Sequence, residues 1–226
     1  MIKAVLFDFD ETLQDRTAAF ESYMKAFFKE FRPELKGGEL EKYVNSMRVA
    51  DNGGYVDRVK WHEGLKKEWK WDAAPPAKEL AEHYIHTFGY HIKIYKNAPD
   101  VLKELKEKGY KVGVLTNGPS YLQNHKMRES GLLPLVDILL VGGDIGVQKP
   151  EARFFEIGAE KLNLKTNECV YVGDHPVNDI QGALNAGMKA IRMNTGWFKD
   201  KDFRPDVPVI DDIIQVPDVL ETFREE

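Results

Sequence analysis

Short apolar runs alternate along much of the chain with segments in which apolar residues recur every three or four positions. The runs predict strands at residues 4–9, 111–115, 138–141, 170–172 and 190–193. The periodic segments predict helices at residues 100–108, 120–130, 151–162 and 179–186, and glycine directly follows three of them. Strands this apolar are buried on both faces, so the alternation predicts an α/β fold: a parallel sheet with helices on either side.

One long segment breaks this pattern directly after the first strand. Residues 14–95 hold 14 of the 25 aromatic residues, and between Phe20 and Phe31 the apolar positions follow a helical repeat. Proline and glycine separate this helix from further helical stretches. We therefore expect a mainly α-helical insertion at 14–95 within a core made of residues 1–13 and 96–226.

Composition narrows the class of protein. With 226 residues, 42% of them hydrophobic, the chain can build a real core, which excludes a disordered or collagen-like protein. We find no apolar run of about 18 residues that could span a membrane, and no secretory signal. A single cysteine, Cys169, suits a reducing compartment, so we expect a cytoplasmic protein. The acidic surface is compatible with a monomer or a weak homodimer. A net charge of −5 without basic blocks disfavours nucleic acid polymers and membranes as partners.

Acidic residues follow the first strand. In a parallel sheet the ligand site lies beyond the carboxyl ends of the strands, where Asp8 and Asp10 stand. Alternation in an extended chain sends these two side chains to the same side. Two close carboxylates repel unless one is protonated or a cation neutralises them, and magnesium prefers such oxygen ligands. Paired acids also simply solvate loops, so this pair is informative only together with its neighbours.

Residues after the later predicted strands carry groups that can bind phosphate oxygens or a cation. Thr116 and Asn117, before a glycine, offer a hydroxyl and an amide that can bind phosphate oxygens. Lys149 precedes a proline and can place a positive charge beside a phosphoryl group or a carboxylate. Asp174 follows the fourth strand and would complete an oxygen-rich cation site, whereas Asp179 alone is explained as the start of the next helix.

These motifs occur in order at consecutive strand ends, as DFDET, LTNG, a lysine before proline, and GDHPVND. Together they resemble the haloacid dehalogenase-like (HAD) hydrolase superfamily, in particular its subfamily I. The resemblance implies a Rossmann-like, three-layer core with a parallel sheet plus an inserted α-helical cap of the C1 type at 14–95.

The same resemblance implies a role for each motif residue. Asp8 would be the nucleophile that forms an aspartyl-phosphate, and Asp10 would protonate the leaving oxygen and later activate water. Asp8, Asp174 and the backbone carbonyl of Asp10 would hold Mg²⁺. The phosphoryl group would be bound by Thr116, Asn117 and Lys149, while Asp179 would support the Asp174 loop.

The function implied is a magnesium-dependent phosphatase acting on small phosphate monoesters, with a nucleoside monophosphate as the first substrate to test and sugar phosphates next. Asp10 favours phosphate esters, because the dehalogenases of this superfamily lack an acid there. Two alternatives stay open: a phosphomutase of the same superfamily, and a non-catalytic module that binds magnesium or accepts phosphate. The tryptophans Trp69 and Trp71 either stack on a substrate ring or belong to the core of the helical insertion.

Overall fold

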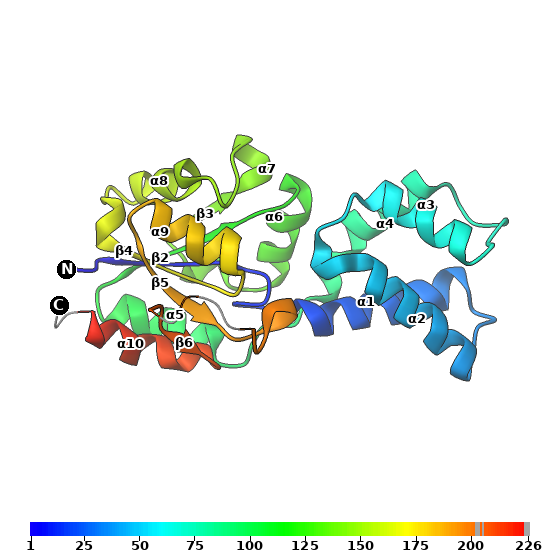
Figure 1. Cartoon of the computed structure of the whole chain (residues 1–226), viewed down its shortest axis with the longest axis horizontal. Helices are drawn as coiled ribbons and strands as arrows, with labels where there is room; N and C mark the ends of the chain where they lie inside the picture. The colour runs from blue at the N-terminus through cyan, green and yellow to red at the C-terminus, as the bar shows by residue number, and fades with distance from the viewer. Residues whose placement is uncertain (202–203, 205, 224–226) are drawn as a thin grey trace. The chain divides into compact units, whose positions relative to one another are not determined.

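The computed structural model describes residues 1–201, 204 and 206–223, and these divide into two compact units. The sheet unit comprises Met1–Arg16 and Ile92–Glu226, and the helical unit comprises Thr17–His91. Each unit has its own buried apolar side chains. Figure 1 draws the helices and strands of both units.

Within its described residues, the sheet unit contains one sheet of six parallel strands in the order β3-β2-β1-β4-β5-β6. The strands are β1 (Ala4–Phe7), β2 (Lys111–Thr116), β3 (Ile138–Val141), β4 (Cys169–Gly173), β5 (Lys189–Met193) and β6 (Val209–Ile210). Phe7 at the end of β1 pairs with Val114 of β2 on one side and with Val172 of β4 on the other. The ends of these three central strands therefore meet at one edge of the sheet.

Helices cover both faces of this sheet (Figure 1). They are α5 (Ala98–Glu107), α6 (Ser120–Glu129), α7 (Gly142–Ile145), α8 (Ala152–Lys161), α9 (Gly182–Asn185) and α10 (Val216–Thr222). Val5 and Phe7 of β1 join the core beneath α5 and α10, whereas Ala4 and Leu6 join the core beneath α8 and α9. Alternate residues of one strand thus enter opposite cores, which explains why the strands are apolar throughout.

Short helical turns complete the sheet unit: η3 (Leu133–Leu135), η4 (Thr166–Glu168), η5 (Pro176–Gln181), η6 (Gly196–Phe198) and η7 (Ile213–Gln215). The predicted three-layer α/β fold is confirmed. Two local predictions differ from the structure. The first strand ends at Phe7, and the helical segment after β4 begins at Pro176 instead of Asp179. His175 caps it, because its Nδ1 accepts hydrogen bonds from the backbone N–H groups of Val177 and Asn178.

The helical unit is built around aromatic side chains. Its helices are α1 (Arg16–Phe31, which begins one residue before the unit), α2 (Gly37–Asp51), α3 (Arg58–Glu68) and α4 (Ala77–Thr87), with the turns η1 (Asn52–Gly54) and η2 (Phe88–His91). The Tyr23 ring lies within 6.2 Å of the rings of Phe20, Tyr84 and Phe88. Aromatic pairs at such distances contribute about 0.5–1.5 kcal/mol each beyond their burial.

Across the described part of the chain, every helix is too short or too polar to cross a membrane.

Candidate active site

The carboxyl ends of β1, β2 and β4 bring together side chains from four distant parts of the sequence. Asp8 directly follows β1, and its backbone N–H donates to Val172 of β4 at 2.9 Å. Thr116 is the last residue of β2, and Asp174 directly follows β4. All three are buried. The sheet order alone therefore makes these residues neighbours.

Lys149 lies at the centre of this edge. Its buried Nζ is 2.8 Å from Oδ1 of Asp8, 2.6 Å from Oδ1 of Asp179 and 2.9 Å from the hydroxyl oxygen of Tyr171. Burial alone would lower the pKa of Lys149, but the carboxylates of Asp179 and Asp8 raise this pKa above its usual value. Lys149 is therefore a permanent cation shared by two carboxylates.

The Asn117 side chain fixes the backbone of Lys149. Its Oδ1 accepts from the Lys149 N–H at 2.8 Å, and its Nδ2 donates to the Lys149 carbonyl at 2.9 Å. This pair of hydrogen bonds ties the loop after β2 to the segment before α8. Asn117 thus determines where the ammonium group of Lys149 can lie.

Three buried carboxylates gather around this lysine. Oxygens of Asp8, Asp174 and Asp179 lie within 4.8 Å of one another. Burial, opposed by Lys149 and aided by the charges of Asp179 and Asp10, raises the pKa of Asp8 to about 7. Burial, followed by the charges of Asp179 and Asp8, also holds the pKa of Asp174 well above its ordinary value. One lysine does not balance three carboxylates, so the oxygen-rich donor set fits a hard divalent cation.

Asp179 is held on both of its oxygens. Oδ1 accepts from Lys149, and Oδ2 accepts from the backbone N–H of His175 at 2.9 Å. Gly173 makes room for this carboxyl group, because a Cβ at that position would lie 2.5 Å from Cγ of Asp179. Asp179 therefore links β4, the loop that carries Asp174, and Lys149.

Asp10 has a second buried lysine of its own. Lys126 of α6 places Nζ 2.5 Å and 2.6 Å from the two carboxylate oxygens. Gln123 donates to Oδ2 at 3.1 Å, and Gln14 donates to Oδ1. Burial opposes ionisation, but Lys126 and then Arg16 outweigh it and lower the pKa of Asp10. Asp10 is thus held as a carboxylate whose two oxygens are both hydrogen-bonded.

Neither Gln123 nor Lys126 was predicted as a site residue from the sequence. Both are 2% exposed, and they lie one turn apart on α6. No signal in the sequence marked this burial, because a lysine on a helix is ordinarily exposed.

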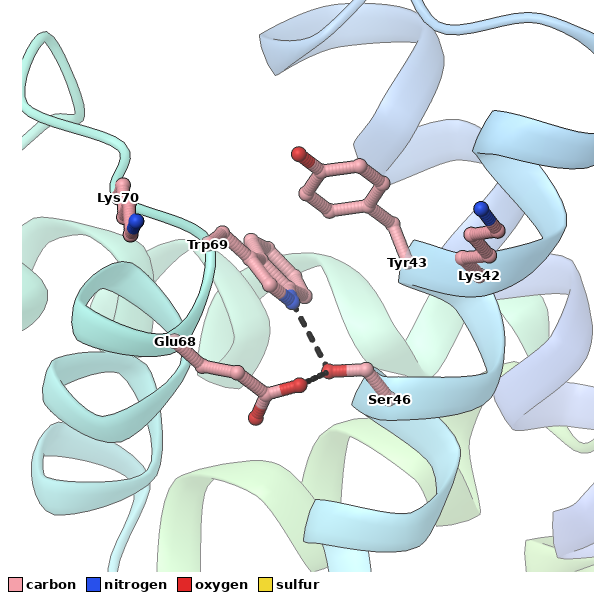
Figure 2. A pocket seen from close by; sticks show the side chains of 6 residues that line it. All are labelled: Lys42, Tyr43, Ser46, Glu68, Trp69 and Lys70. Carbon is pink, nitrogen blue, oxygen red and sulfur yellow. Dashed lines mark hydrogen bonds between the residues drawn. The ribbon is translucent and has the colours of Figure 1, made fainter.

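A separate cavity of about 360 Å³ lies in the helical unit (Figure 2). It is lined by Lys42, Tyr43, Ser46, Glu68, Trp69 and Lys70. Trp69 donates from Nε1 to Ser46 at 2.8 Å, and the Ser46 hydroxyl donates to Glu68 at 2.6 Å. The indole also packs 5.1 Å from the Tyr43 ring and 5.6 Å from the Phe28 ring. Trp69 is therefore part of the internal packing of this unit.

Comparison with known proteins agrees with this geometry. The family profile of haloacid dehalogenase-like hydrolases matches residues 5–193. A glyceraldehyde 3-phosphate phosphatase from Methanopyrus kandleri is 32% identical, over 100% of this chain and 98% of the relative. The pyrimidine 5'-nucleotidase YjjG from Escherichia coli is 26% identical, over 84% of this chain and 85% of the relative.

A solved structure shares the fold along nearly the whole chain. The HAD hydrolase YfnB from Bacillus subtilis, crystallised bound to magnesium, has a TM-score of 0.78 at 22% identity. The match covers 97% of this chain and 98% of the other.

Proposed function

Because this chain belongs to the haloacid dehalogenase-like hydrolases, we propose that it is a magnesium-dependent phosphatase that cleaves small phosphate monoesters through an aspartyl-phosphate. The observation that carries the proposal is the buried group of Asp8, Asp174 and Asp179 around Lys149 at the carboxyl edge of the sheet. Phosphoryl transfer depends mainly on positioning and on compensation of charge, and this group supplies both.

In the first step, a carboxylate oxygen of Asp8 attacks phosphorus. A bond forms between that oxygen and phosphorus, the ester P–O bond breaks, and Asp10, which first takes up a proton from solvent, gives that proton to the leaving oxygen. Lys149, 2.8 Å from Asp8, offsets negative charge next to the nucleophile. Thr116 binds the transferring phosphoryl group, and Asn117 contributes by holding Lys149 in place.

In the second step, water attacks the phosphorus of the aspartyl-phosphate while Asp10 accepts a proton, and phosphate leaves with Asp8 restored. Mg²⁺ would be held by Asp8, Asp174 and the backbone carbonyl of Asp10, with Asp179 supporting the loop, and would offset the charge of the phosphoryl oxygens. The donor set fits this ion, since magnesium prefers carboxylate oxygens.

For the substrate, we propose a small soluble phosphate ester, with residues 14–95 acting as the cap that selects it. A relative that matches this chain from end to end is a glyceraldehyde 3-phosphate phosphatase, so three-carbon phosphates become the first candidates. Pyrimidine nucleoside monophosphates follow, because another relative hydrolyses these nucleotides. Packing of Trp69 within the helical unit gives no separate support for stacking on a base.

A phosphate-release assay tests the proposal. Purified protein should hydrolyse p-nitrophenyl phosphate and three-carbon phosphates with Mg²⁺, and EDTA should abolish the activity. Asp8→Asn should lower kcat by at least about 10³-fold, whereas the matched variant Asp72→Asn, at an exposed aspartate of the helical unit, should not change it.

Each alternative predicts a different result. Undiminished turnover by Asp8→Asn would show that no aspartyl-phosphate forms. Inactivity on a broad panel of phosphate esters would favour the non-catalytic module. Transfer of the phosphoryl group to a second position of the same sugar, in place of release, would identify a phosphomutase.

A further inference from the structure

The contacts of α6 suggest a role for this helix in the proposed reaction. Gln123 and Lys126 project from it toward Asp10, which lies more than one hundred positions earlier in the sequence. Lys126 also donates to Oε1 of Gln123 at 2.7 Å, so the two side chains hold each other as well as Asp10. Their contacts with Asp10 are therefore made by one coupled pair.

Gln123 connects Asp10 to the end of β2. Its Nε2 is 3.1 Å from Oδ2 of Asp10, 2.7 Å from Oγ1 of Thr116 and 2.7 Å from the carbonyl oxygen of Asn117. Gly118 provides the space for this side chain, because a Cβ there would lie 3.0 Å from Cγ of Gln123, at a φ of +127°. A single amide thus fixes the acid that follows β1 relative to the hydroxyl that ends β2.

The buried positive charge of Lys126 is not explained by a contribution to the stability of the fold. It is buried, its Nζ lies 5.3 Å from the centre of the Phe9 ring, and it contacts both oxygens of Asp10. Replacing a buried ion pair by apolar groups is often neutral or stabilising, so such a pair points to a role in positioning.

We propose that Gln123 and Lys126 are positioning residues that set the orientation of the Asp10 carboxyl group for proton transfer to the leaving group. This inference rests on the proposed phosphatase function. Neither residue touches the phosphoryl group in this scheme. Their effect should therefore depend on how much the leaving group needs a proton.

Two esters separate this effect from a general loss of activity. Nitrophenolate leaves from p-nitrophenyl phosphate without a proton, whereas the alkoxide from glycerol 3-phosphate requires one. With enzyme in excess over substrate, a single turnover reports the first chemical step for each ester. We expect Lys126→Met and Gln123→Met to slow this step about 10²-fold or more for glycerol 3-phosphate, and less than about 10-fold for the nitrophenyl ester.

Two further variants complete the experiment. Lys126→Arg keeps the cation and should recover the rate on glycerol 3-phosphate to within about 10-fold of the unmodified protein. Arg128→Met removes an exposed cation of the same helix and should change neither rate. If Lys126→Met fails to fold by circular dichroism, Gln123→Met decides the test, since it leaves the ion pair of Lys126 with Asp10 in place.

The outcomes distinguish this inference from the proposed function. Equal losses on the two esters, or no loss on either, would overturn the positioning role while the phosphatase stands. If the unmodified protein cleaves neither ester, the proposed function fails, and the positioning role fails with it.

Discussion

Two aspartates that stand two positions apart in the sequence are paired with different buried lysines. Asp8 contacts Lys149, and Asp10 contacts Lys126. Burial dominates at Asp8 and raises its pKa to about 7, whereas Lys126 and Arg16 prevail at Asp10 and lower its pKa. One short segment thus carries two carboxyl groups whose pKa values shift in opposite directions.

The burial of Asp8 predicts a conflict between function and stability. Asp8→Asn removes a carboxylate that the folded state holds at a raised pKa, so it should increase the free energy of unfolding by about 2 kcal/mol in metal-free buffer at pH 8. The gain should be smaller at pH 5, because the folded protein then holds Asp8 protonated. Thermal and urea unfolding measure both values. A loss of stability at pH 8 would contradict the prediction.

Added Mg²⁺ provides the control for this measurement. An ion that binds only the folded state stabilises it in proportion to the logarithm of its concentration above Kd. Mg²⁺ should therefore raise the unfolding midpoint of the unmodified protein more than that of Asp8→Asn.

Gly173 gives a second prediction for a single residue. A Cβ at this position would lie 2.5 Å from Cγ of Asp179, which is fully buried and already held by Lys149 and His175. Gly173→Ala should therefore displace that carboxyl group, lower the free energy of unfolding by about 1–3 kcal/mol and reduce phosphatase activity at least about 10-fold.

Urea unfolding and steady-state kinetics check the two effects of Gly173→Ala. Gly38→Ala is the matched control, because a Cβ there meets no atom within 4 Å. Normal activity in Gly173→Ala would mean that Asp179 can shift without consequence.

The motif residues could be found from the sequence, but the contacts of α6 could not. Asp8, Thr116 and Asp174 could be identified because they stand at the ends of predicted strands, and parallel strands end at one edge. Lys149 could be identified because it precedes a proline. Lys126 lies inside a helix, and a lysine there is ordinarily exposed. Only the packing of α6 against the rest of the sheet unit turns its side chain toward Asp10.

At the scale of elements, two helices of the sheet unit were predicted most closely. The predicted helices at 120–130 and 151–162 correspond to α6 and α8 within one residue at each end. The prediction for the segment after β4 was wrong in detail, because His175 and not Asp179 caps the helical segment. The carboxylate of Asp179 is instead bound to Lys149. The strand β6 was missed because two residues, Val209 and Ile210, give no periodic pattern.

Two glycines predict opposite responses to the same substitution. Gly64 lies inside α3, and a Cβ there meets nothing within 4 Å, so Gly64→Ala should stabilise the protein by about 0.5–1 kcal/mol. Gly109 has equally open surroundings, but its φ is +86°, a conformation that strains an L side chain. Gly109→Ala should therefore destabilise the protein by about 1 kcal/mol. Urea unfolding of both variants tests the pair, and a gain at Gly109 would refute the assigned turn.

At the scale of the whole molecule, the two units differ in how they use aromatic and charged residues. The sheet unit gathers acids around two buried lysines, whereas the helical unit is filled by rings. Composition predicted this contrast, because residues 14–95 hold 14 of the 25 aromatic residues. It could not predict which ring packs on which, since a helical repeat gives the buried face and leaves the partners undetermined.

The last prediction concerns how this aromatic packing responds to acid. His62 is 1% exposed, and its ring lies 4.6 Å from the Trp61 ring and 5.9 Å from the Phe27 ring. Burial, aided by the charge of Arg58, lowers the pKa of His62 to about 3. The folded protein therefore keeps His62 neutral, whereas the unfolded chain takes up a proton below about pH 6.5. Stability from this residue is fully present above pH 6.5 and is lost as the pH falls toward 3.

Urea unfolding followed by tryptophan fluorescence measures this loss, because Trp61, Trp69 and Trp71 all lie in the helical unit. Between pH 7 and pH 5 the unmodified protein should lose about 2 kcal/mol more than His62→Phe, which keeps a ring but cannot take up a proton. His86→Gln, at an exposed position of α4, should behave like the unmodified protein. Equal pH dependence in the unmodified protein and His62→Phe would mean that the buried ring accepts a proton without unfolding.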